Sequence, residues 1–507
     1  MAVEASPRWL DRLERAGNRL PEPMTLFALA LVAILMISHL AELAGLALPH
    51  PRGESTIRAR SLLDSDGVWW LTSHLVENFV EFRPLGLVLV AMLGMGLAER
   101  SGLFAAAFRR AMRRLPARLL TPGVLVLGIL MAADPGYIIL PPLAALLFAA
   151  AGRPPLAGLA AAAAGVAAGF SANYVVTFLD AMLAGLTETA AHLIAPDYAV
   201  YITANWYFMA ASAVILPLVG WWVTSRWVEP RLEGPGSAAE EEDGAAIDTA
   251  DEGENPERGL RWARRTLALT VAALVAASTL PGAPLAGTGE AGPRWMEALV
   301  PMMLLVFALP GLAYGLGAGT IRSDRDVANM LHETMALMGS YIVLAFFAAQ
   351  MIAAFDHSRL GTLLAIGGGE LLAGIGLPAT LLMMGMAVTA MVLNLFIGSA
   401  SAKYALLAPV FVPMFMQAGI SPELTQAAYR VGDSVTNAIT PMNPYLVVIL
   451  TFLRRWRPDA GLGTLMALQL PYSLAFAVVW LALLAGWIAL GWPLGPGAGL
   501  TFEGGGG

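Results

Sequence analysis

The sequence contains no cysteine, which excludes a disulfide framework and any thiolate metal site. Charged residues are scarce as well. They make up 13% of the 507 residues, whereas soluble domains contain roughly 25%. Hydrophobic residues account for 57%. This composition excludes an ordinary soluble domain and predicts an all-α polytopic membrane protein, whose surroundings are a lipid bilayer and not a nucleic acid.

Lysine and histidine are nearly absent. Lys403 is the single lysine among 30 basic residues, and no two of the six histidines are close enough in sequence to form a pair of metal ligands. We therefore expect no zinc site and no cofactor other than a coupling ion. The net charge of -7 says little about a ligand, because nine acids lie between residues 240 and 257. We interpret residues 233–257 as an acidic cytoplasmic linker.

Long hydrophobic runs recur along the chain, and a bilayer core of about 30 Å needs about 20 apolar residues per helix. The sequence predicts nine spans, at about 24–46, 85–103, 156–186, 205–223, 267–280, 298–316, 339–355, 425–453 and 465–490. Arginine clusters near 109–118, 258–265 and 454–457 place these loops and the N-terminus in the cytoplasm, and leave the C-terminus outside. Residues 1–23 predict an amphipathic helix on the inner membrane surface.

Two pairs of segments depart from this pattern. The first member of each pair, at about 119–152 and 379–416, has two apolar arms that are too short to span, which predicts a re-entrant hairpin. We place the joint of the first hairpin at residues 134–137 together with Pro141 and Pro142, and that of the second at residues 398–401.

The second member of each pair is a predicted broken helix, at about 156–186 and 425–453. The breaks are expected at residues 169–173 in the first, and at residues 432–437 and again at Pro441 and Pro444 in the second. A long tilted helix is the alternative for the first.

The two hairpin and broken-helix units have opposite predicted orientations, which is typical of transporters built from inverted repeats. The stretches 169–173 and 432–436 are also weakly similar. These features divide the chain into five parts: an N-terminal segment 1–23, a first membrane half 24–232, the linker 233–257, a second membrane half 258–493 and a Gly-rich tail 494–507.

Five charged residues lie within the interrupted segments, where a charge is costly and therefore indicates function. Asp134, which precedes a proline, is either a turn residue or a ligand. Asp433 is predicted to coordinate Na⁺ or carry a proton, unless it caps the next half-helix. Arg430 either neutralises Asp433 or clamps a substrate carboxylate. Asp180 either couples an ion or lies near solvent at the end of its span. Lys403 contacts an anion, moves protons or snorkels to the interface.

Four runs of sequence resemble the AbgT family of bacterial inner-membrane transporters. They are GFSANYVVTFLDAMLAG, NWYFMAASAVILPLVGWWVTSRWVEPRL, GSASAKYALLAPVFVPMF and QAAYRVGDSVTNAITPMNPY. The resemblance implies nine transmembrane helices with two oppositely oriented hairpins, in a homodimer. It also implies transport of p-aminobenzoyl-glutamate, or ion-gradient-driven export of sulfonamide antimetabolites.

The same resemblance implies residues that line the path or affect transport, namely Asp180, Asn394, Ser401, Pro422, Arg430, Asp433 and Pro441. Where the family has a tryptophan after the lysine, this chain has Tyr404, whose aromatic face suits stacking on a benzoyl or sulfonamide ring. We add Ser399 and Lys403 at the hairpin tip, and contacts at the helix breaks from Gly169, Ser171, Asn173, Gly432, Ser434 and Asn437. A sodium ion is expected at Asp433 and Asn394.

The sequence therefore predicts a secondary transporter, not an enzyme, for a small aromatic anion, driven by Na⁺ or H⁺. A sodium-coupled di- or tricarboxylate transporter is the nearest alternative, in which Arg430 and the hairpin serines hold carboxylates. An intramembrane hydrolase with a buried carboxylate pair is a third hypothesis, although the sequence has no motif for it.

Overall fold

The computed structural model describes residues 23–49, 56–112, 116–130, 134–232, 253–289, 293–443 and 445–502. The predicted amphipathic segment before residue 23 and residues 233–252 of the acidic linker lie outside this range. The described chain is mostly helical.

Five helices are long and apolar enough to cross a membrane: α2 (Pro23–Leu43), α11 (Trp206–Val223, continued by η2 and α12 to Leu232), α15 (Leu299–Ala318), α17 (Gly339–His357) and α23 (Leu462–Leu490). A sixth candidate is the pair α5 (Arg83–Arg100) and α6 (Leu103–Met112), which is bent by 60°. The chain is thus a multi-pass membrane protein. The other three predicted spans fall on α13 (Pro256–Thr279), which begins with arginines, and on two interrupted helices.

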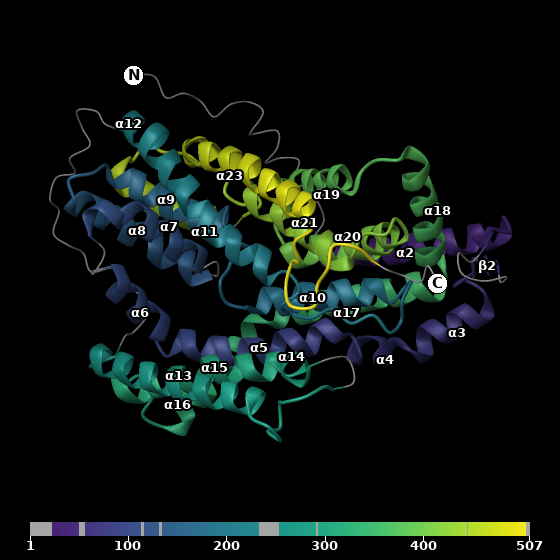
Figure 1. Cartoon of the computed structure of the whole chain (residues 1–507), viewed down its shortest axis with the longest axis horizontal. Helices are drawn as coiled ribbons and strands as arrows, with labels where there is room; N and C mark the ends of the chain where they lie inside the picture. Colours follow the sequence, from purple (N-terminus) through teal and green to yellow (C-terminus); the bar gives the residue numbers. More distant parts are fainter. Residues whose placement is uncertain are drawn as a thin grey trace.

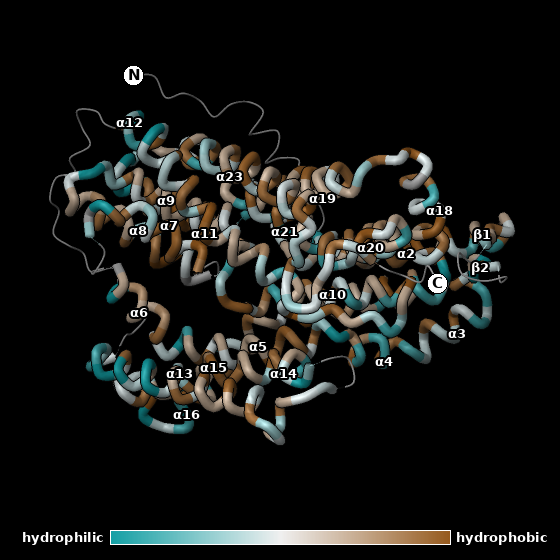
Figure 2. Tube along the Cα trace, viewed as in Figure 1, coloured by the Kyte–Doolittle hydropathy of each residue, from teal (hydrophilic) through white to brown (hydrophobic). Residues whose placement is uncertain are grey.

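The remaining elements are short or peripheral. The described residues between α2 and α5 form an antiparallel pair of strands, β1 (Ala47–Pro49) and β2 (Thr56–Arg58), followed by two short helices. The full set comprises α3 (Ser65–Ser73), α4 (Leu75–Val80), η1 (Ala117–Leu119), η2 (Thr224–Val228), α12 (Glu229–Leu232), α14 (Arg294–Glu297), α16 (Asp324–Leu337) and α18 (Leu360–Ile375). Figure 2 shows hydrophobic residues dominating α7 and α11, whereas hydrophilic residues gather along α16.

Each predicted hairpin is a pair of short helices. The first consists of α7 (Leu120–Leu130) and α8 (Asp134–Ala150), and the second of α19 (Ala379–Asn394) and α20 (Ala400–Gln417). We had expected residues 134–137, together with Pro141 and Pro142, to join the arms, but all of these residues lie inside α8. The second arm of the other hairpin begins at Ala400, because Ser399 caps the helix by accepting a hydrogen bond from the Ala402 amide.

Both predicted broken helices are interrupted. The first consists of α9 (Pro155–Ala167) and α10 (Phe178–Ala191), with the expected residues 169–173 in the gap. The second consists of α21 (Pro422–Val435) and α22 (Tyr445–Trp456), with Pro441 in the gap as expected, but the break predicted at residues 432–437 begins too early. Pro444 lies outside the residues that the structure describes. The helix continues through residues 432–435 and ends at Thr436, so Gly432, Asp433 and Ser434 belong to the last turns of α21.

Each hairpin and broken-helix unit places one half of its broken helix against the other unit (Figure 1). Helix α9 packs on the first hairpin, while α10, the other half of the same broken helix, packs on α20 and α21. Helix α21 in turn packs on the second hairpin, while α22 packs on α8 and α9. Each broken helix therefore contacts both hairpins, and its break lies where the two units meet. A second group, formed by α5, α13, α15 and α16, packs together and meets the units through the contact of α5 with α10.

Candidate functional site

Helix α21 is the centre of the candidate site. Every residue from Pro422 to Val435 is buried, including Arg430 and Asp433, which an amphipathic surface helix would expose. Gly432 permits this position, because a Cβ atom there would overlap the carbonyl oxygen of Ala387 on α19. Burying two charged groups on one helix requires partners for both. The structure provides a different partner for each.

Arg430 pairs with Asp180, at the start of α10. Its Nη1 atom lies 2.7 Å from Oδ1 of Asp180, and its Nη2 donates to the backbone oxygen of Ser171 at 2.9 Å. The Arg430 side chain is 1% exposed. The expectation that Arg430 neutralises Asp433 is thus wrong, because its carboxylate partner comes from the first half of the chain. The alternative position of Asp180 near solvent is wrong as well, since it is buried.

The carboxylate of Asp180 is held by several further donors. Its Oδ2 atom accepts from Nδ2 of Asn173 at 2.9 Å, and from the amide and hydroxyl of Thr177 at 2.7 and 2.8 Å. Thr177 and Asp180 form the capping box that begins α10. One carboxylate therefore starts the second half of a broken helix and also balances a guanidinium from the other unit.

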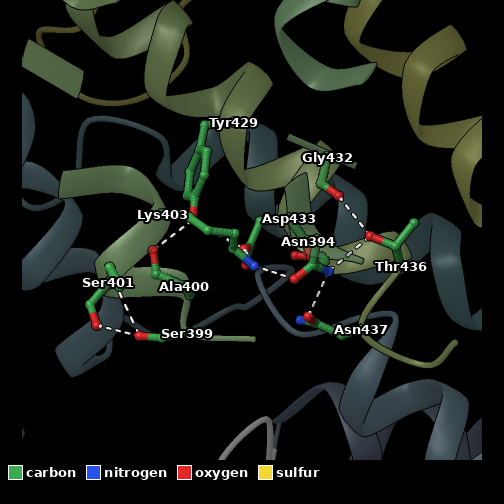
Figure 3. A network of polar contacts seen from close by, with 12 residues as sticks. Asn394, Ser399, Ala400, Ser401, Lys403, Tyr429, Gly432, Asp433, Thr436 and Asn437 are labelled. Atoms are coloured by element: carbon green, nitrogen blue, oxygen red, sulfur yellow. Dashed lines mark hydrogen bonds and ion pairs between the residues drawn. The ribbon is translucent and has the colours of Figure 1, made fainter. Parts of the chain in front are cut away.

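Lys403 pairs with Asp433 within the second half of the chain (Figure 3). The ammonium of Lys403 lies 2.6 Å from Oδ1 of Asp433 and also donates to Oδ1 of Asn394. The two charged side chains are 0% and 2% exposed. Snorkelling of Lys403 to the interface is therefore wrong for this conformation.

Asn394 organises this pair from the end of α19. Its Nδ2 lies 2.7 Å from the backbone oxygen of Asp433, and 2.8 Å from both Oγ1 of Thr436 and Oδ1 of Asn437. These acceptors lie where α21 ends and the chain turns, so the amide satisfies groups that the helix leaves open. Figure 3 shows Asn394 between the lysine and the turn.

The cation of Lys403 occupies the position that we expected for sodium. The two oxygens predicted to hold Na⁺ belong to Asp433 and Asn394, and in this structure both contact the lysine ammonium. A metal ion at these oxygens would need the ammonium to leave, because both are compact cations that need the same ligands. The sodium site therefore stays a prediction, and it requires the Lys403 ammonium to move away from these two oxygens.

The hairpin tip is polar but partly closed. The hydroxyls of Ser399 and Ser401 lie 3.0 Å apart and are only half-buried. Tyr404 is fully buried, with its hydroxyl 2.7 Å from Oγ1 of Thr187 on α10 and its ring 4.4 Å from that of Tyr429. Its aromatic face is therefore covered by protein in this conformation, and stacking on a substrate would require the hairpin to move.

The other predicted residues mark the two breaks. Gly169 and Ser171 lie in the first, and the amide of Ser171 donates to Oγ of Ser434 at 3.1 Å. The two stretches that looked similar in sequence thus touch in space, although one is a loop and the other a helical turn. Pro422 is the first residue of α21, and Pro441 lies in the turn after it; neither contributes a polar side chain.

Sequence reasoning missed three residues of this region. Tyr429 places its hydroxyl 3.0 Å from Oδ1 of Asp433, and Thr177 binds Asp180. The sequence did not mark either residue as functional, because tyrosine and threonine are common in helical segments that have no function. Glu423 was overlooked because an acid in the first turn of a helix is ordinary.

Comparison with known proteins gives a consistent result. The model of the "AbgT putative transporter family" matches residues 8–502. The p-aminobenzoyl-glutamate transport protein of Escherichia coli (strain K12) is 36% identical over 493 residues, which cover 96% of this chain and 95% of that protein.

Two solved structures are also similar to this one. The YdaH transporter of Alcanivorax borkumensis, described as having an unusual topology, has a TM-score of 0.88 and 43% identity, covering 94% of this chain and 100% of that one. MtrF of Neisseria gonorrhoeae, described as illuminating a class of antimetabolite efflux pumps, has a TM-score of 0.90 and 42% identity, covering 97% of this chain and 100% of that one.

Proposed function

Because the chain belongs to the AbgT transporter family, we propose that it is a secondary active transporter of the bacterial inner membrane, which moves p-aminobenzoyl-glutamate, exports sulfonamide antimetabolites, or does both. The similar E. coli protein is named for the first activity and MtrF for antimetabolite efflux. The driving force in this proposal is a gradient of H⁺ or Na⁺.

The proposed architecture has nine transmembrane helices and two oppositely oriented hairpins, in a homodimer with the N-terminus in the cytoplasm and the C-terminus in the periplasm. Five continuous helices, the bent pair α5 and α6, helix α13 and the two broken helices supply the nine. The reciprocal packing of each broken helix on both hairpins supports an inverted repeat.

One observation carries the functional proposal: two ion pairs are buried on neighbouring turns of α21, where the two units meet. A structural protein gains little from such pairs, because their desolvation offsets most of the attraction. A transporter uses them, because an ion that enters the site can take over a partner and so change which arrangement of the units is stable. In our proposal, the coupling cation competes with Lys403 for Asp433 and Asn394.

The substrate site in this proposal opens at the hairpin tip. Ser399 and Ser401 remain half-buried, whereas Tyr404 is covered. Movement of the second hairpin away from α10 would break the contact between Tyr404 and Thr187 and expose an aromatic face beside the two hydroxyls. An aromatic, anionic small molecule suits such a surface, with Arg430 or Lys403 for its acidic part.

The test is counterflow in proteoliposomes containing the purified protein. We expect labelled p-aminobenzoyl-glutamate to exchange against itself and to be displaced by a sulfonamide, and an imposed H⁺ or Na⁺ gradient to drive its net movement. Exchange of succinate or citrate instead would identify a dicarboxylate carrier. Release of p-aminobenzoate from p-aminobenzoyl-glutamate would identify a hydrolase. Either result, without exchange of the aromatic substrates, would overturn the proposal.

A further inference from the structure

One buried carboxylate pairs with no cation in the part of the chain that the structure describes. The described part of the chain buries four acidic side chains, those of Asp180, Glu188, Glu423 and Asp433. Asp180 pairs with Arg430 and Asp433 with Lys403. Glu188 contacts Arg83 and lies 3.7 Å from the imidazole of His192. Among the described residues, Glu423 forms no ion pair.

Glu423 lies in the first turn of α21, where only neutral groups surround its carboxyl. The hydroxyl of Tyr198, in the loop between α10 and α11, lies 3.1 and 3.0 Å from its two oxygens. From the same loop, Nδ2 of Asn205 donates to the Glu423 backbone oxygen at 2.9 Å. Tyr404 on α20 is the other titratable group near it. The C-terminal segment adds the ring of Phe502, which packs edge-on against Tyr198, and the backbone oxygens of residues 499 and 500, which bond Ser421.

Unpartnered polar atoms lie on the same segments. Oδ1 of Asn205, Oγ1 of Thr203 and Oε1 of Gln426, one turn after Glu423, are buried and have no hydrogen-bond partner among the described residues. Two of these atoms are amide oxygens, which only accept hydrogen bonds. An ionised Glu423 can only accept hydrogen bonds, as can the two unpartnered amide oxygens on these segments. A protonated Glu423 instead supplies an O–H.

We propose that Glu423 is a proton-binding site, separate from the two ion pairs, and that it is a protonated carboxylic acid in this conformation. Burial without a cation strongly disfavours the charged form of a carboxyl group, and the group avoids that penalty by taking up a proton. Tyr198 is only half-buried and follows the exposed Asp197, so the proton has a short route to water. Seven residues separate Glu423 from Arg430, about 10 Å along the helix.

Its role in coupling rests on the proposed transport function. Loss of the proton would leave a negative charge beside Tyr198 that this packed end of α21 cannot balance. The loop between α10 and α11 and the C-terminal segment would then have to separate from α21 and admit water. Glu423 thereby links the proton concentration in the water near Tyr198 to the separation of the two hairpin and broken-helix units.

Infrared difference spectroscopy tests protonation directly and does not depend on transport. We expect the wild-type protein at neutral pH to show the C=O stretch of a protonated carboxylic acid, and Glu423→Gln, which keeps the shape of the acid, to lose it. Glu188→Gln is the matched control, because Glu188 has its own arginine, and it should retain the band. Absence of the band from the wild type, or its presence in Glu423→Gln, overturns the proposal.

A second variant decides the matter if Glu423→Gln does not fold. Tyr198→Phe keeps the carboxyl but removes its hydroxyl partner, so the band should move to higher frequency as that hydrogen bond is lost. A band that does not move would overturn the assignment to Glu423.

Transport tests the coupling role separately. In proteoliposomes, Glu423→Gln should retain counterflow, which needs no net proton movement. Substrate accumulation driven by a pH gradient should be at least about fivefold lower in this variant than in the wild type. Unchanged accumulation overturns the coupling role. If the wild type shows no counterflow of either substrate, the proposed function fails, while the infrared band still decides whether Glu423 carries a proton.

Discussion

The two buried ion pairs of α21 differ in what they connect and in how many donors their carboxylates accept from. Arg430 and Asp180 join the two halves of the chain across 250 positions, and the carboxylate accepts from the arginine, from Asn173 and twice from Thr177. Lys403 and Asp433 both belong to the second half. Among the described residues, Lys403 and Tyr429 contact the Asp433 carboxylate, and both contacts fall on Oδ1.

This difference suggests different roles: one ion pair holds the two units together, and the other changes its partner when an ion binds. Arginine keeps its proton under all ordinary conditions, and its planar fork here also binds the Ser171 backbone. That pair is suited to holding the two units together. Lysine is a compact cation that can lose its proton when buried, and its two oxygen partners are ligands that a metal ion would use. The Lys403 pair is therefore the better candidate for ion coupling, and Asp180 is the weaker of the two aspartates that the sequence suggested.

The largest effect should come from removing each carboxylate in turn. Asp180→Asn leaves a buried guanidinium that cannot lose its charge, and we expect it to cost about 3–5 kcal/mol of unfolding free energy. Asp433→Asn should cost clearly less, because Lys403 can lose its proton. Thermal unfolding in detergent at several pH values measures both.

The pH dependence sharpens this prediction. Raising the pH should recover stability in Asp433→Asn, as the lysine gives up its proton, and should not do so in Asp180→Asn. Equal losses with the same response to pH would contradict the division into a holding pair and a switching pair.

The next effect concerns gradient dependence. If Asp433 and Lys403 are the switch, Asp433→Asn should reduce the dependence of substrate transport on the ion gradient by about 5–150-fold, which corresponds to about 1–3 kcal/mol of coupling. Proteoliposome uptake with and without imposed H⁺ and Na⁺ gradients measures it, with Glu188→Gln as the control. Normal transport by Asp433→Asn, with the wild-type gradient dependence, would show that the coupling ion binds elsewhere.

The smallest effect should come from the contact that closes the hairpin. Tyr404→Phe removes the hydroxyl that bonds Thr187 but keeps the ring beside Tyr429, so we expect a stability loss of about 1 kcal/mol. If this contact holds the hairpin closed, binding of an aromatic substrate should become tighter in the variant. Thr187→Val is the matched variant, and the two changes together should cost little more than either alone. Additive losses would show that the two side chains do not act on each other.

Much of the architecture follows from local sequence, and the exceptions have identifiable causes. The first break falls at residues 169–173 as predicted, where glycine and polar residues interrupt an alanine-rich helix. The second was placed too early, because Gly432 in a polar run resembles a break. In the structure, that glycine serves close packing against Ala387, and the helix continues past it. Pro141 and Pro142 were placed in the joint of the first hairpin because proline usually interrupts a helix, but α8 contains both of them.

The sequence by itself determined that this is a helical membrane protein, that it has two interrupted units, and that Asp180, Lys403, Arg430 and Asp433 are costly enough to need a function. Hydrophobicity, helix length and the price of a buried charge are properties of local segments, so they can be read locally. Only the tertiary structure decided which charge pairs with which. Arg430 lies three residues from Asp433 but bonds Asp180, and Glu423 is the buried acid for which the described residues provide no cation. Ion pairs form between atoms that folding brings together and not between neighbours in the chain.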